Sequence, residues 1–513
     1  MRQLEQVFFS VLLVMVCCQA VSGYRILSII GSPSRSHVIV QEALAKELAR
    51  RGHQVTMVSP FPSEHPVDNY REITVPISDW GKSTMALFLK DQSRFASFIN
   101  FPTMCKIFMD SSNDTINDPE VRRVILKEKF DLLIVGIMGD FILGVGQLIG
   151  APTMVVCPNA AMGVVNDMFG NPYPISAVPN AMLGIASPMN FTNRIKNLFS
   201  YILELVFGWY IKSVSERYYN SNFPRDKFPA YDVARKNVSL VLINQHFTKA
   251  SPRPYVQSMV EIGGLQIKPT PDPLPGDLQQ WMDGAEDGII FFSLGTNIQS
   301  SSMPSEKLNA VLNTFRELKQ RIVWKWDSHD MPDKPPNVLL RKWLPQDDIL
   351  AHKNVRLFIT HGGLGGVAEA QYHGVPLVGI PIFGDQKGNL EKVKREGWAV
   401  IVEFAELTED TLTRAVNEVL NNASYRETVK SLADLYRDRP MSPMDTAVFW
   451  TEYVIRHKGA KHMRYPGVDL NFWQRHLLDV IAVLGAGVFV VVKLISYTYQ
   501  LCRRKVLSKI KLN

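Results

Sequence analysis

Cysteine is scarce in this chain. Its 513 residues include five cysteines, and Cys17, Cys18 and Cys502 lie in segments near the two ends that have the character of targeting elements. Only Cys105 and Cys157 remain for the body of the protein. Two thiols allow at most one disulfide, so the sequence excludes both a disulfide framework and a cysteine-rich metal cluster.

Excess charge is also scarce in the body of the chain. The net charge is +7, and the last twelve residues, CRRKVLSKIKLN, contain five basic residues and no acidic residue. The rest of the chain is therefore nearly neutral, and we expect no nucleic acid partner. The charged fraction of 20% and the hydrophobic fraction of 46% are typical of a globular protein, and the length suffices for two or three domains.

The two ends of the chain carry targeting patterns. Residues 1–23 have a basic residue near the start, an apolar stretch and small residues at the end, which predicts a cleaved signal peptide. Residues 478–499 have the ~20-residue length and the apolar composition of a transmembrane helix. Apart from Asp479, Lys493 is the only charge in that stretch, so a buried core helix is the weaker interpretation. The basic tail, residues 500–513, is expected in the cytosol.

The tail also contains a spacing that resembles an endoplasmic reticulum retrieval signal. Lys509 and Lys511 occupy the fifth and third positions from the carboxyl end. The alternative is a basic cluster that anionic lipids attract. Together with the signal peptide and the span, the spacing predicts a single-pass type I protein of the endoplasmic reticulum membrane with a lumenal body. Four glycosylation sequons, which suit a lumenal body, begin at Asn113, Asn190, Asn237 and Asn422.

Short β-type runs alternate with helical patterns along the body, as in parallel sheets that helices cover on both faces. One series of runs occupies residues 24–265, and a second series occupies residues 277–460. Between them, residues 266–276 contain four prolines, which is typical of a semi-rigid extended linker. We therefore predict an α/β protein with two Rossmann-like, doubly wound domains that face each other across a cleft.

Polar and aromatic side chains follow several expected strands of the second domain. In an open α/β sheet, ligands bind at the carboxyl ends of the strands. Packing alone does not explain why aromatic, amide and carboxylate side chains all follow the strands at the carboxyl edge of this sheet, which we call the rim. The sequence therefore predicts a ligand site there. The candidate residues are Ser293, Gly295, Thr296, Trp343, Gln346, His361, Glu369, Asp385 and Gln386.

The stretch THGGLGGVAEA, residues 360–370, is the most specific part of this rim. It follows an apolar run that is expected to be a buried strand. Its glycines allow backbone amides to approach a ligand closely, and a helix that begins there directs its positive end toward the turn. The stretch therefore predicts an anion site, with Glu369 about one helical turn further on.

Residues 343–386 resemble the donor-binding signature of the UDP-glycosyltransferase family. The similarity extends over nearly the whole chain and includes the signal peptide and the carboxy-terminal span, as in the membrane-bound animal glucosyl- and glucuronosyltransferases. The resemblance implies the two-domain GT-B fold. The residues in the family's register are Trp343, Pro345, Gln346, His361, Gly362, Gly363, Glu369, Gly374, Pro376, Pro381, Asp385 and Gln386.

The resemblance implies a role for each residue of the rim. Trp343 would stack on the uracil of a UDP-sugar, Gln346 would hydrogen-bond the uracil edge or the ribose, and Glu369 would accept both ribose hydroxyls. Most of the other residues would contact the diphosphate or the sugar. His361 and the amides around Gly363, Gly365 and Gly366 are assigned to the diphosphate, which Ser293 or Thr296 would also reach; Gly295 is assigned to the UDP-sugar site without a specific part, and Asp385 and Gln386 are assigned to the sugar hydroxyls.

Sugar transfer also needs a base that removes the proton of the acceptor hydroxyl. His37, in the loop after the first expected strand, matches the catalytic histidine of the family. In the family an aspartate at the end of a later strand steadies this histidine, but the matching position here is Gly136. The nearest acidic residues are Asp140 and Asp131, and we take Asp140 as the candidate.

These expectations combine into one reaction. A sugar, glucose or glucuronic acid, would pass with inversion from a UDP-sugar to a hydroxyl of a small lipophilic acceptor, as in detoxification or in hormone or pigment conjugation. The sequence has no Asp-x-Asp pair for a metal, so backbone amides, a helix end and His361 would meet the diphosphate charge without a cofactor. The acceptor pocket is expected in the first domain. There, residues 199–214 form either a core helix, a pocket wall or a membrane-facing surface.

Gly136 leaves a second function open. The chain would then bind a UDP-sugar or a lipophile without turnover and regulate active relatives in the membrane, in a homo- or hetero-oligomer. A nucleotide-sugar epimerase also has a two-domain cleft, but such enzymes seldom carry a signal peptide and a span. The sugar and the acceptor stay open at this point.

Overall fold

The structure is a computed structural model that describes residues 23–63, 66–78, 100–249, 252–328, 331 and 333–510. The chain divides into two compact units, residues 1–464 and residues 465–513. The predicted signal peptide up to residue 22, and Lys511 of the predicted retrieval signal, lie outside the described residues.

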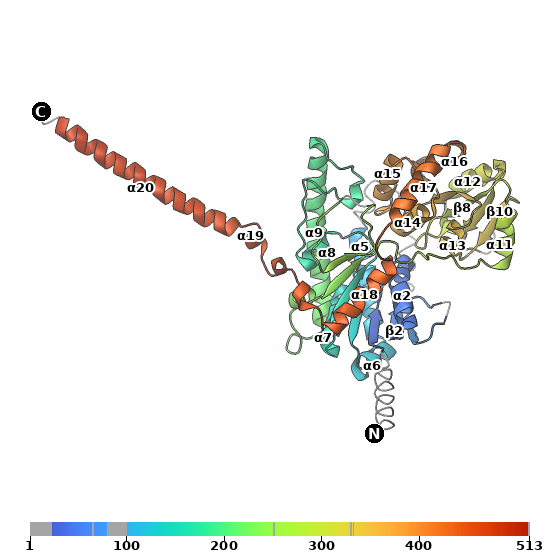
Figure 1. The fold of residues 1–513 in the computed structure, drawn as a ribbon, viewed down its shortest axis with the longest axis horizontal. Helices are drawn as coiled ribbons and strands as arrows, with labels where there is room; N and C mark the ends of the chain where they lie inside the picture. The colour runs from blue at the N-terminus through green and yellow to red at the C-terminus, as the bar shows by residue number, and fades with distance from the viewer. Residues whose placement is uncertain are drawn as a thin grey trace, which may run out of the picture. The chain divides into compact units, whose positions relative to one another are not determined.

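The first unit contains two parallel sheets (Figure 1). The first sheet has seven strands in the order β3-β2-β1-β4-β5-β6-β7, and its strands pair in parallel. This is the doubly wound order, in which the chain reverses direction across the sheet between β1 and β4. The strands are β1 (Arg25–Ile29), β2 (Gln54–Ser59), β3 (Tyr70–Thr74), β4 (Leu132–Gly136), β5 (Thr153–Cys157), β6 (Leu240–Ile243) and β7 (Met259–Glu261).

The second sheet repeats this topology with six parallel strands in the order β10-β9-β8-β11-β12-β13. Its reversal lies between β8 and β11. The two sheets confirm the predicted pair of Rossmann-like domains. The strands are β8 (Ile289–Ser293), β9 (Arg321–Lys325), β10 (Val338–Arg341), β11 (Val355–Thr360), β12 (Leu377–Gly379) and β13 (Ala399–Ile401).

Helices connect the strands of each sheet. The helices of the first sheet are α2 (Arg35–Arg50), α5 (Phe101–Asn117), α6 (Pro119–Lys127), α7 (Gly144–Ile149), α8 (Gly163–Phe169), α9 (Phe191–Asn222) and α10 (Tyr231–Lys236). The helices of the second sheet are α11 (Gly276–Asp283), α12 (Ser305–Glu317), α13 (Gln346–Leu350), α14 (Leu364–His373), α15 (Gln386–Arg395), α16 (Glu409–Asn421) and α17 (Ala423–Arg437).

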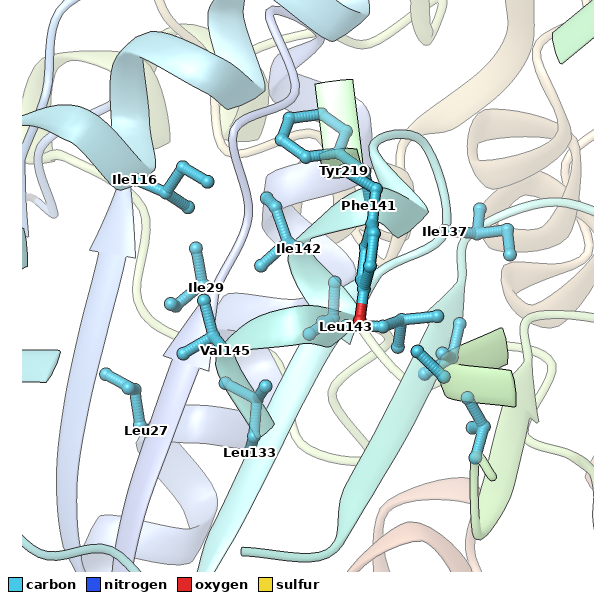
Figure 2. Close-up of a cluster of buried hydrophobic side chains, with 14 of the residues drawn as sticks. Leu27, Ile29, Ile116, Leu133, Ile137, Phe141, Ile142, Leu143, Val145 and Tyr219 are labelled. Carbon is cyan, nitrogen blue, oxygen red and sulfur yellow. The ribbon is translucent and has the colours of Figure 1, made fainter. Parts of the chain in front are cut away.

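The strands of the first sheet are apolar on both faces because helices cover both faces. In β1, Leu27 and Ile29 belong to one buried cluster, whereas Ile26 belongs to another that includes residues of α2. Successive side chains of a strand point to opposite faces, so the two clusters are the two sides of one sheet. Figure 2 shows the first cluster, with residues Leu27, Ile29, Ile116, Leu133, Ile137, Phe141, Ile142, Leu143, Val145 and Tyr219.

The second domain is shorter than the predicted range 277–460. After α17 the chain returns to the first domain as α18 (Pro443–Arg456), which contacts α2. Ala447 and Val448 are buried in the cluster that contains Ile26 of β1. The boundary was misplaced because the amphipathic pattern of α18 shows that one face is buried but not which sheet it covers.

The proline-rich segment 266–276 is bound to the second domain along its length. The amide of Lys268 donates to Asp347 Oδ2 at 2.8 Å, and the amide of Asp272 donates to Asp348 Oδ1 at 2.7 Å. Leu274 is buried in a cluster of the second sheet. The segment therefore has more contacts than a free spacer would have.

Helix α9 does not form a buried core helix. It has 32 residues, and only a few of them, among them Val214 and Tyr219, are buried. Its middle exposes a row of large apolar side chains, which excludes the core interpretation of residues 199–214. The exposed residues of this row are Phe199, Ile202, Leu203, Leu205, Val206 and Trp209.

The two body cysteines do not form the disulfide that the sequence allowed. Cys105 on α5 and Cys157 on β5 are both free and buried. Burial raises the pKa of each thiol to about 12, so both thiols stay protonated at neutral pH.

The second unit contains α19 (Phe472–Arg475) and α20 (Leu478–Ile510). The most apolar 18-residue window of α20 has a mean hydropathy of 2.4, and the helix is long and apolar enough to cross a membrane over residues 478–505. This helix agrees with the predicted span at residues 478–499.

Candidate functional site

Hydrogen bonds link the two sheets at their reversal points, between the loop after β1 and the loop after β8. Ser34, in the loop after β1, and Asn297, in the loop after β8, exchange hydrogen bonds at 2.9 and 3.0 Å. A reversal point leaves a crevice at the carboxyl ends of the strands, where ligands bind in this class of fold. His37 lies three residues after Ser34, so the candidate base and the rim of the second sheet belong to one interdomain site.

The glycine-rich turn before α14 brings its backbone close to neighbouring groups. Gly362 has a φ of +85°, a conformation that favours glycine. A Cβ on Gly363, the N-cap residue of α14, would lie 2.6 Å from Nε2 of His361, and one on Gly295 would lie 2.5 Å from its Cε1. Side chains at these positions would displace the imidazole. The two glycines therefore let the His361 imidazole lie against the amino end of α14, where the helix favours an anion.

His361 and Lys325 are the charged or titratable groups beside this turn. Burial lowers the pKa of His361 to about 4, with a smaller effect of Lys325, so the imidazole is neutral at neutral pH. Lys325 Nζ donates to the carbonyl of Gly295 at 2.5 Å, and burial lowers its pKa to about 8. The sequence did not single out Lys325. It lies in β9, and only the sheet order brings it next to the loop after β8.

Glu369 lies on α14 and is buried. Its Oε2 accepts a hydrogen bond from Gln346 Nε2 at 2.5 Å, and its Oε1 accepts one from Gln266 Nε2 at 3.2 Å. Burial, followed by the charge of Asp347, raises the pKa of Glu369 to about 7. The structure therefore brings together Gln346 and Glu369, the two residues expected at the uracil and ribose, and adds Gln266 from the linker.

Trp343 is exposed and lies between cations of both domains. The Arg35 guanidinium lies 5.6 Å from the centre of its ring, and Lys325 Nζ lies 5.7 Å from it. An exposed indole near the end of β10 offers a face on which a base can stack. Arg35 comes from α2 of the first domain, so this face too adjoins both domains.

Asp385 and Gln386 lie at the start of α15. Asp385 Oδ2 accepts a hydrogen bond from Asn389 Nδ2 at 2.9 Å, and burial raises the pKa of the Asp385 carboxyl. Gln386 Oε1 accepts the amides of Ile382 and Phe383 at 2.8 and 2.9 Å. These bonds hold the loop after β12 in a fixed conformation.

The residues that end β8 are close to the same turn. Ser293 is buried, and its Oγ accepts the amide of Gly295 at 3.2 Å. Thr296 is half-buried in the following loop. In α14, a Cβ on Gly366 would lie 3.2 Å from Gln346 Nε2, and one on Gly365 would lie 3.5 Å from Gln266 Nε2.

His37 lies in the first turn of α2 and is partly buried. Its Nδ1 is 3.2 Å from Oγ of Ser32, and its ring centre is 5.7 Å from that of Phe108. Burial lowers the pKa of the imidazole to about 4. A neutral imidazole has a free nitrogen lone pair, which is the state that a general base requires. Ser32 is a further residue that sequence reasoning missed.

Asp140 does not contact His37 in the described part of the chain. Its Oδ2 accepts hydrogen bonds from Tyr231 Oη at 2.7 Å and from Arg235 Nε at 3.0 Å, and all three side chains are buried. The expectation that Asp140 orients His37 is therefore not borne out. Its carboxylate neutralises Arg235, and removing one partner of such a buried pair leaves an uncompensated charge.

Gly136 stands where the resemblance places the acidic partner of His37, and neighbouring side chains fill the space beside it. A Cβ on Gly136 would lie 2.9 Å from side-chain atoms of Ile30 and 3.4 Å from Oε1 of Gln41. Ile30 and Gln41 thus fill the space that a larger residue at position 136 would need. Gln41 instead donates to Ser28 Oγ at 2.9 Å and to the carbonyl of Ile29 at 3.2 Å.

Comparison with known proteins identifies the family of the chain. The sequence profile of the family described as "UDP-glucoronosyl and UDP-glucosyl transferase" matches residues 26–512. The chain belongs to the UDP-glycosyltransferase family. It is 37% identical over 476 residues to UDP-glucosyltransferase 2 of Dactylopius coccus, covering 90% of each chain. It is 30% identical over 521 residues to UDP-glucuronosyltransferase 2B15 of Homo sapiens, covering 97% of each.

Solved structures share the fold of this UDP-glycosyltransferase. One is the crystal structure of UDP-glucose: anthocyanidin 3-O-glucosyltransferase in complex with UDP, with a TM-score of 0.56 and 17% sequence identity. The match covers 85% of this chain and 100% of that chain. The two facing Rossmann-like sheets are therefore of the GT-B type.

We predict that Glu369→Ala weakens binding of UDP-glucose. Losing a charged hydrogen bond typically costs ~1.5–3 kcal/mol, so the dissociation constant should rise by roughly ten- to a hundredfold. Ribose hydroxyls donate best to the ionised carboxylate. Because burial raises the pKa of Glu369 to about 7, affinity in the parent protein should fall as the pH drops through about 7.

Isothermal titration calorimetry of the full-length protein measures both effects. Glu427→Ala removes an exposed carboxylate of α17 and serves as the matched control. Equal affinities for the Glu369 and Glu427 variants, with the same pH dependence, would exclude Glu369 from the donor site.

Proposed function

We propose that the protein transfers a hexose or a hexuronic acid from a UDP-sugar to a hydroxyl of a small lipophilic acceptor, with inversion at the anomeric carbon. Membership of an enzyme family favours this function over non-catalytic binding. The observation that carries it is the bond between Ser34 and Asn297, which joins the start of α2, the helix that contains His37, to the donor rim. A base on one domain then lies opposite a donor on the other.

The donor residues divide by the part of the UDP-sugar that they contact. Trp343 stacks on uracil, while Gln346 and Glu369 bind the uracil edge and the ribose. Lys325, His361, Ser293 and the amides at the start of α14 hold the diphosphate. Asp385 and Gln386 bind sugar hydroxyls. The positions of the Trp343 ring and of the Glu369 and Asp385 carboxylates support this division, since these residues follow β10, β11 and β12 of one parallel sheet.

His37 acts as the base in this proposal. For Nε2 to accept a proton, Nδ1 must carry the ring hydrogen and donate it to Ser32 Oγ, 3.2 Å away. The acceptor hydroxyl gives its proton to Nε2 while its oxygen bonds to the anomeric carbon. The bond from that carbon to the phosphate oxygen breaks, and UDP leaves with the electron pair. Lys325 and the amides of α14 stabilise the negative charge that develops on the diphosphate.

Ser32 takes over the positioning role that an aspartate has elsewhere in the family. A hydroxyl fixes the tautomer but adds no negative charge to stabilise the imidazolium. The ring of Phe108 beside His37 provides an apolar wall, which suits a lipophilic acceptor.

We predict that His37→Ala lowers kcat by about 10²–10⁴-fold, the usual contribution of a general base, and leaves UDP affinity nearly unchanged because His37 lies on the other domain. Ser32→Ala should lower kcat by only about two- to tenfold, the value of one neutral hydrogen bond. Transfer of radiolabelled sugar to a panel of phenols measures kcat, and calorimetry measures UDP binding. Full activity of His37→Ala would remove this residue from the mechanism.

We also propose that α20 anchors the protein in the endoplasmic reticulum membrane, with the first unit in the lumen and the basic tail in the cytosol. The apolar length of α20 and the tail charge support this topology. The exposed apolar row on α9 is suited to contact the lipid surface.

This topology predicts which sequons carry glycans. Asn190, Asn237 and Asn422 are exposed, whereas Asn113 is half-buried and its Oδ1 accepts hydrogen bonds from Asn117 and Asn222. Endoglycosidase treatment of the expressed protein should therefore increase its gel mobility. Asn→Gln changes at the three exposed sites should remove the shift, and Asn113→Gln should leave it intact. A parent protein without any shift would contradict a lumenal body.

A further inference from the structure

A cavity of about 100 Å³ lies at the carboxyl end of β6. The segment after β6 forms one side of it, and the face of α15 with Asn389, Lys392 and Arg395 forms another. Leu364 of α14 also contributes to the lining. The cavity is large enough for a carboxylate group with a few ordered water molecules.

Cations dominate the lining of this cavity. Lys249, Arg253, Lys392 and Arg395 contribute side chains, together with His246. Among the described lining residues there is no aspartate or glutamate. Such a concentration of one charge in a partly desolvated space is unfavourable unless an anion enters it.

Several donors of the lining have no hydrogen-bond partner among the described residues. They include Lys249 Nζ, Arg253 Nε and His246 Nε2, all of which are buried atoms. Nδ1 of His246 accepts the amide of Thr248 at 3.1 Å, so the ring hydrogen of the neutral imidazole is on Nε2. All three atoms are therefore N–H donors, and the described lining also contains an unpartnered acceptor, Gln245 Oε1.

Carboxylates of neighbouring segments are engaged with other groups. Glu261 accepts from Gln245 at 3.0 Å, and Glu204 accepts from Asn180 at 2.8 Å. Glu396 forms an ion pair with Lys392 at 3.4 Å, which partly neutralises that cation. Lys249 has no such pair in the described part of the chain. Burial, followed by the charge of Lys392, lowers the pKa of Lys249 to about 7, the shift expected for an uncompensated cation.

Asn389 connects this cavity to the expected sugar site. It lines the cavity, and its Nδ2 donates to Asp385 Oδ2 at 2.9 Å. Asp385 is the carboxylate that we assign to the sugar hydroxyls. A group bound in the cavity would therefore lie one side chain away from the transferred sugar.

We propose that this cavity is a carboxylate subsite of the glycosyl-transfer site, with Lys249, Arg253 and Lys392 as its recognising cations. The carboxylate belongs either to a uronic acid sugar of the donor or to an acidic acceptor. The inference rests on the proposed transfer function, and it narrows the substrates to those that bring a carboxylate to this position. The charged lining side chains that have a donor without a hydrogen-bond partner among the described residues are those of Lys249, Arg253 and Lys392, and their N–H groups suit a carboxylate. The Tyr436 hydroxyl is a further unpartnered donor in this described lining.

Two substrate pairs, each used with the full-length protein, distinguish the sources of the carboxylate. UDP-glucuronate and UDP-glucose differ in the sugar carboxyl, and 4-hydroxybenzoate and its methyl ester differ in the acceptor carboxyl. Dissociation constants by calorimetry and kcat/KM by product formation are measured for each. In one of the two pairs, Lys249→Gln and Lys392→Gln should each weaken binding of the charged substrate by ~10- to 100-fold more than binding of the neutral substrate. Lys394→Gln, an exposed cation of α15, is the matched control and should not change either ratio.

The outcomes separate this proposal from the proposed function. The protein could bind the charged substrate of a pair more tightly, lose this preference in Lys249→Gln, and yet transfer no sugar. This result would support the subsite and refute the transferase mechanism. The Lys249 and Lys392 variants could instead lose the same affinity for UDP, UDP-glucose and UDP-glucuronate, with no change in the acceptor pair. This result would assign the cations to the diphosphate and overturn the carboxylate subsite. Unchanged ratios in both pairs would overturn it as well.

Discussion

Burial of charge in the interdomain crevice is the constraint on which the site depends. The Glu369 carboxylate is buried on α14 and has two partners, Gln346 after β10 and Gln266 in the linker. A buried carboxylate without hydrogen bonds would cost several kcal/mol, so these bonds fix both the linker and the rim relative to α14. The proposed ribose site and the connection between the domains therefore share one residue, and in this proposal ligand binding has to rearrange contacts that also join the domains.

The positions of the rim residues after the strands of the second sheet could be predicted from the sequence because the pattern is local. The turn before α14 and the residues after β10 and β12 are read from short motifs, and the alternation of strands and helices predicted both sheets. Lys325 and Ser32 could not be predicted, because their proximity to His361 and His37 follows from strand order and loop conformation. The return of α18 to the first sheet was hidden for a related reason, since an apolar face does not identify its partner.

The region around His37 departs furthest from expectation. Asp140 is bound to Arg235, and Ile30 and Gln41 fill the space beside Gly136, so the histidine has a hydroxyl neighbour in place of a carboxylate. Removing that negative charge weakens stabilisation of the imidazolium, but burial keeps the resting imidazole neutral and able to accept a proton. Cations are abundant instead on the β6 side of the crevice, where they favour a substrate that carries its own negative charge.

The stereochemistry of the product tests inverting transfer most directly. UDP-sugars of this kind carry an α-linked sugar, and direct attack by an acceptor that His37 deprotonates gives a β-glycoside. The full-length protein is incubated with UDP-glucose or UDP-glucuronate and a phenolic acceptor, and the anomeric configuration is read from the proton NMR coupling of the purified product. This mechanism predicts a β-glycoside as the sole anomer. An α-glycoside, or consumption of the UDP-sugar without a glycosylated acceptor, would contradict it.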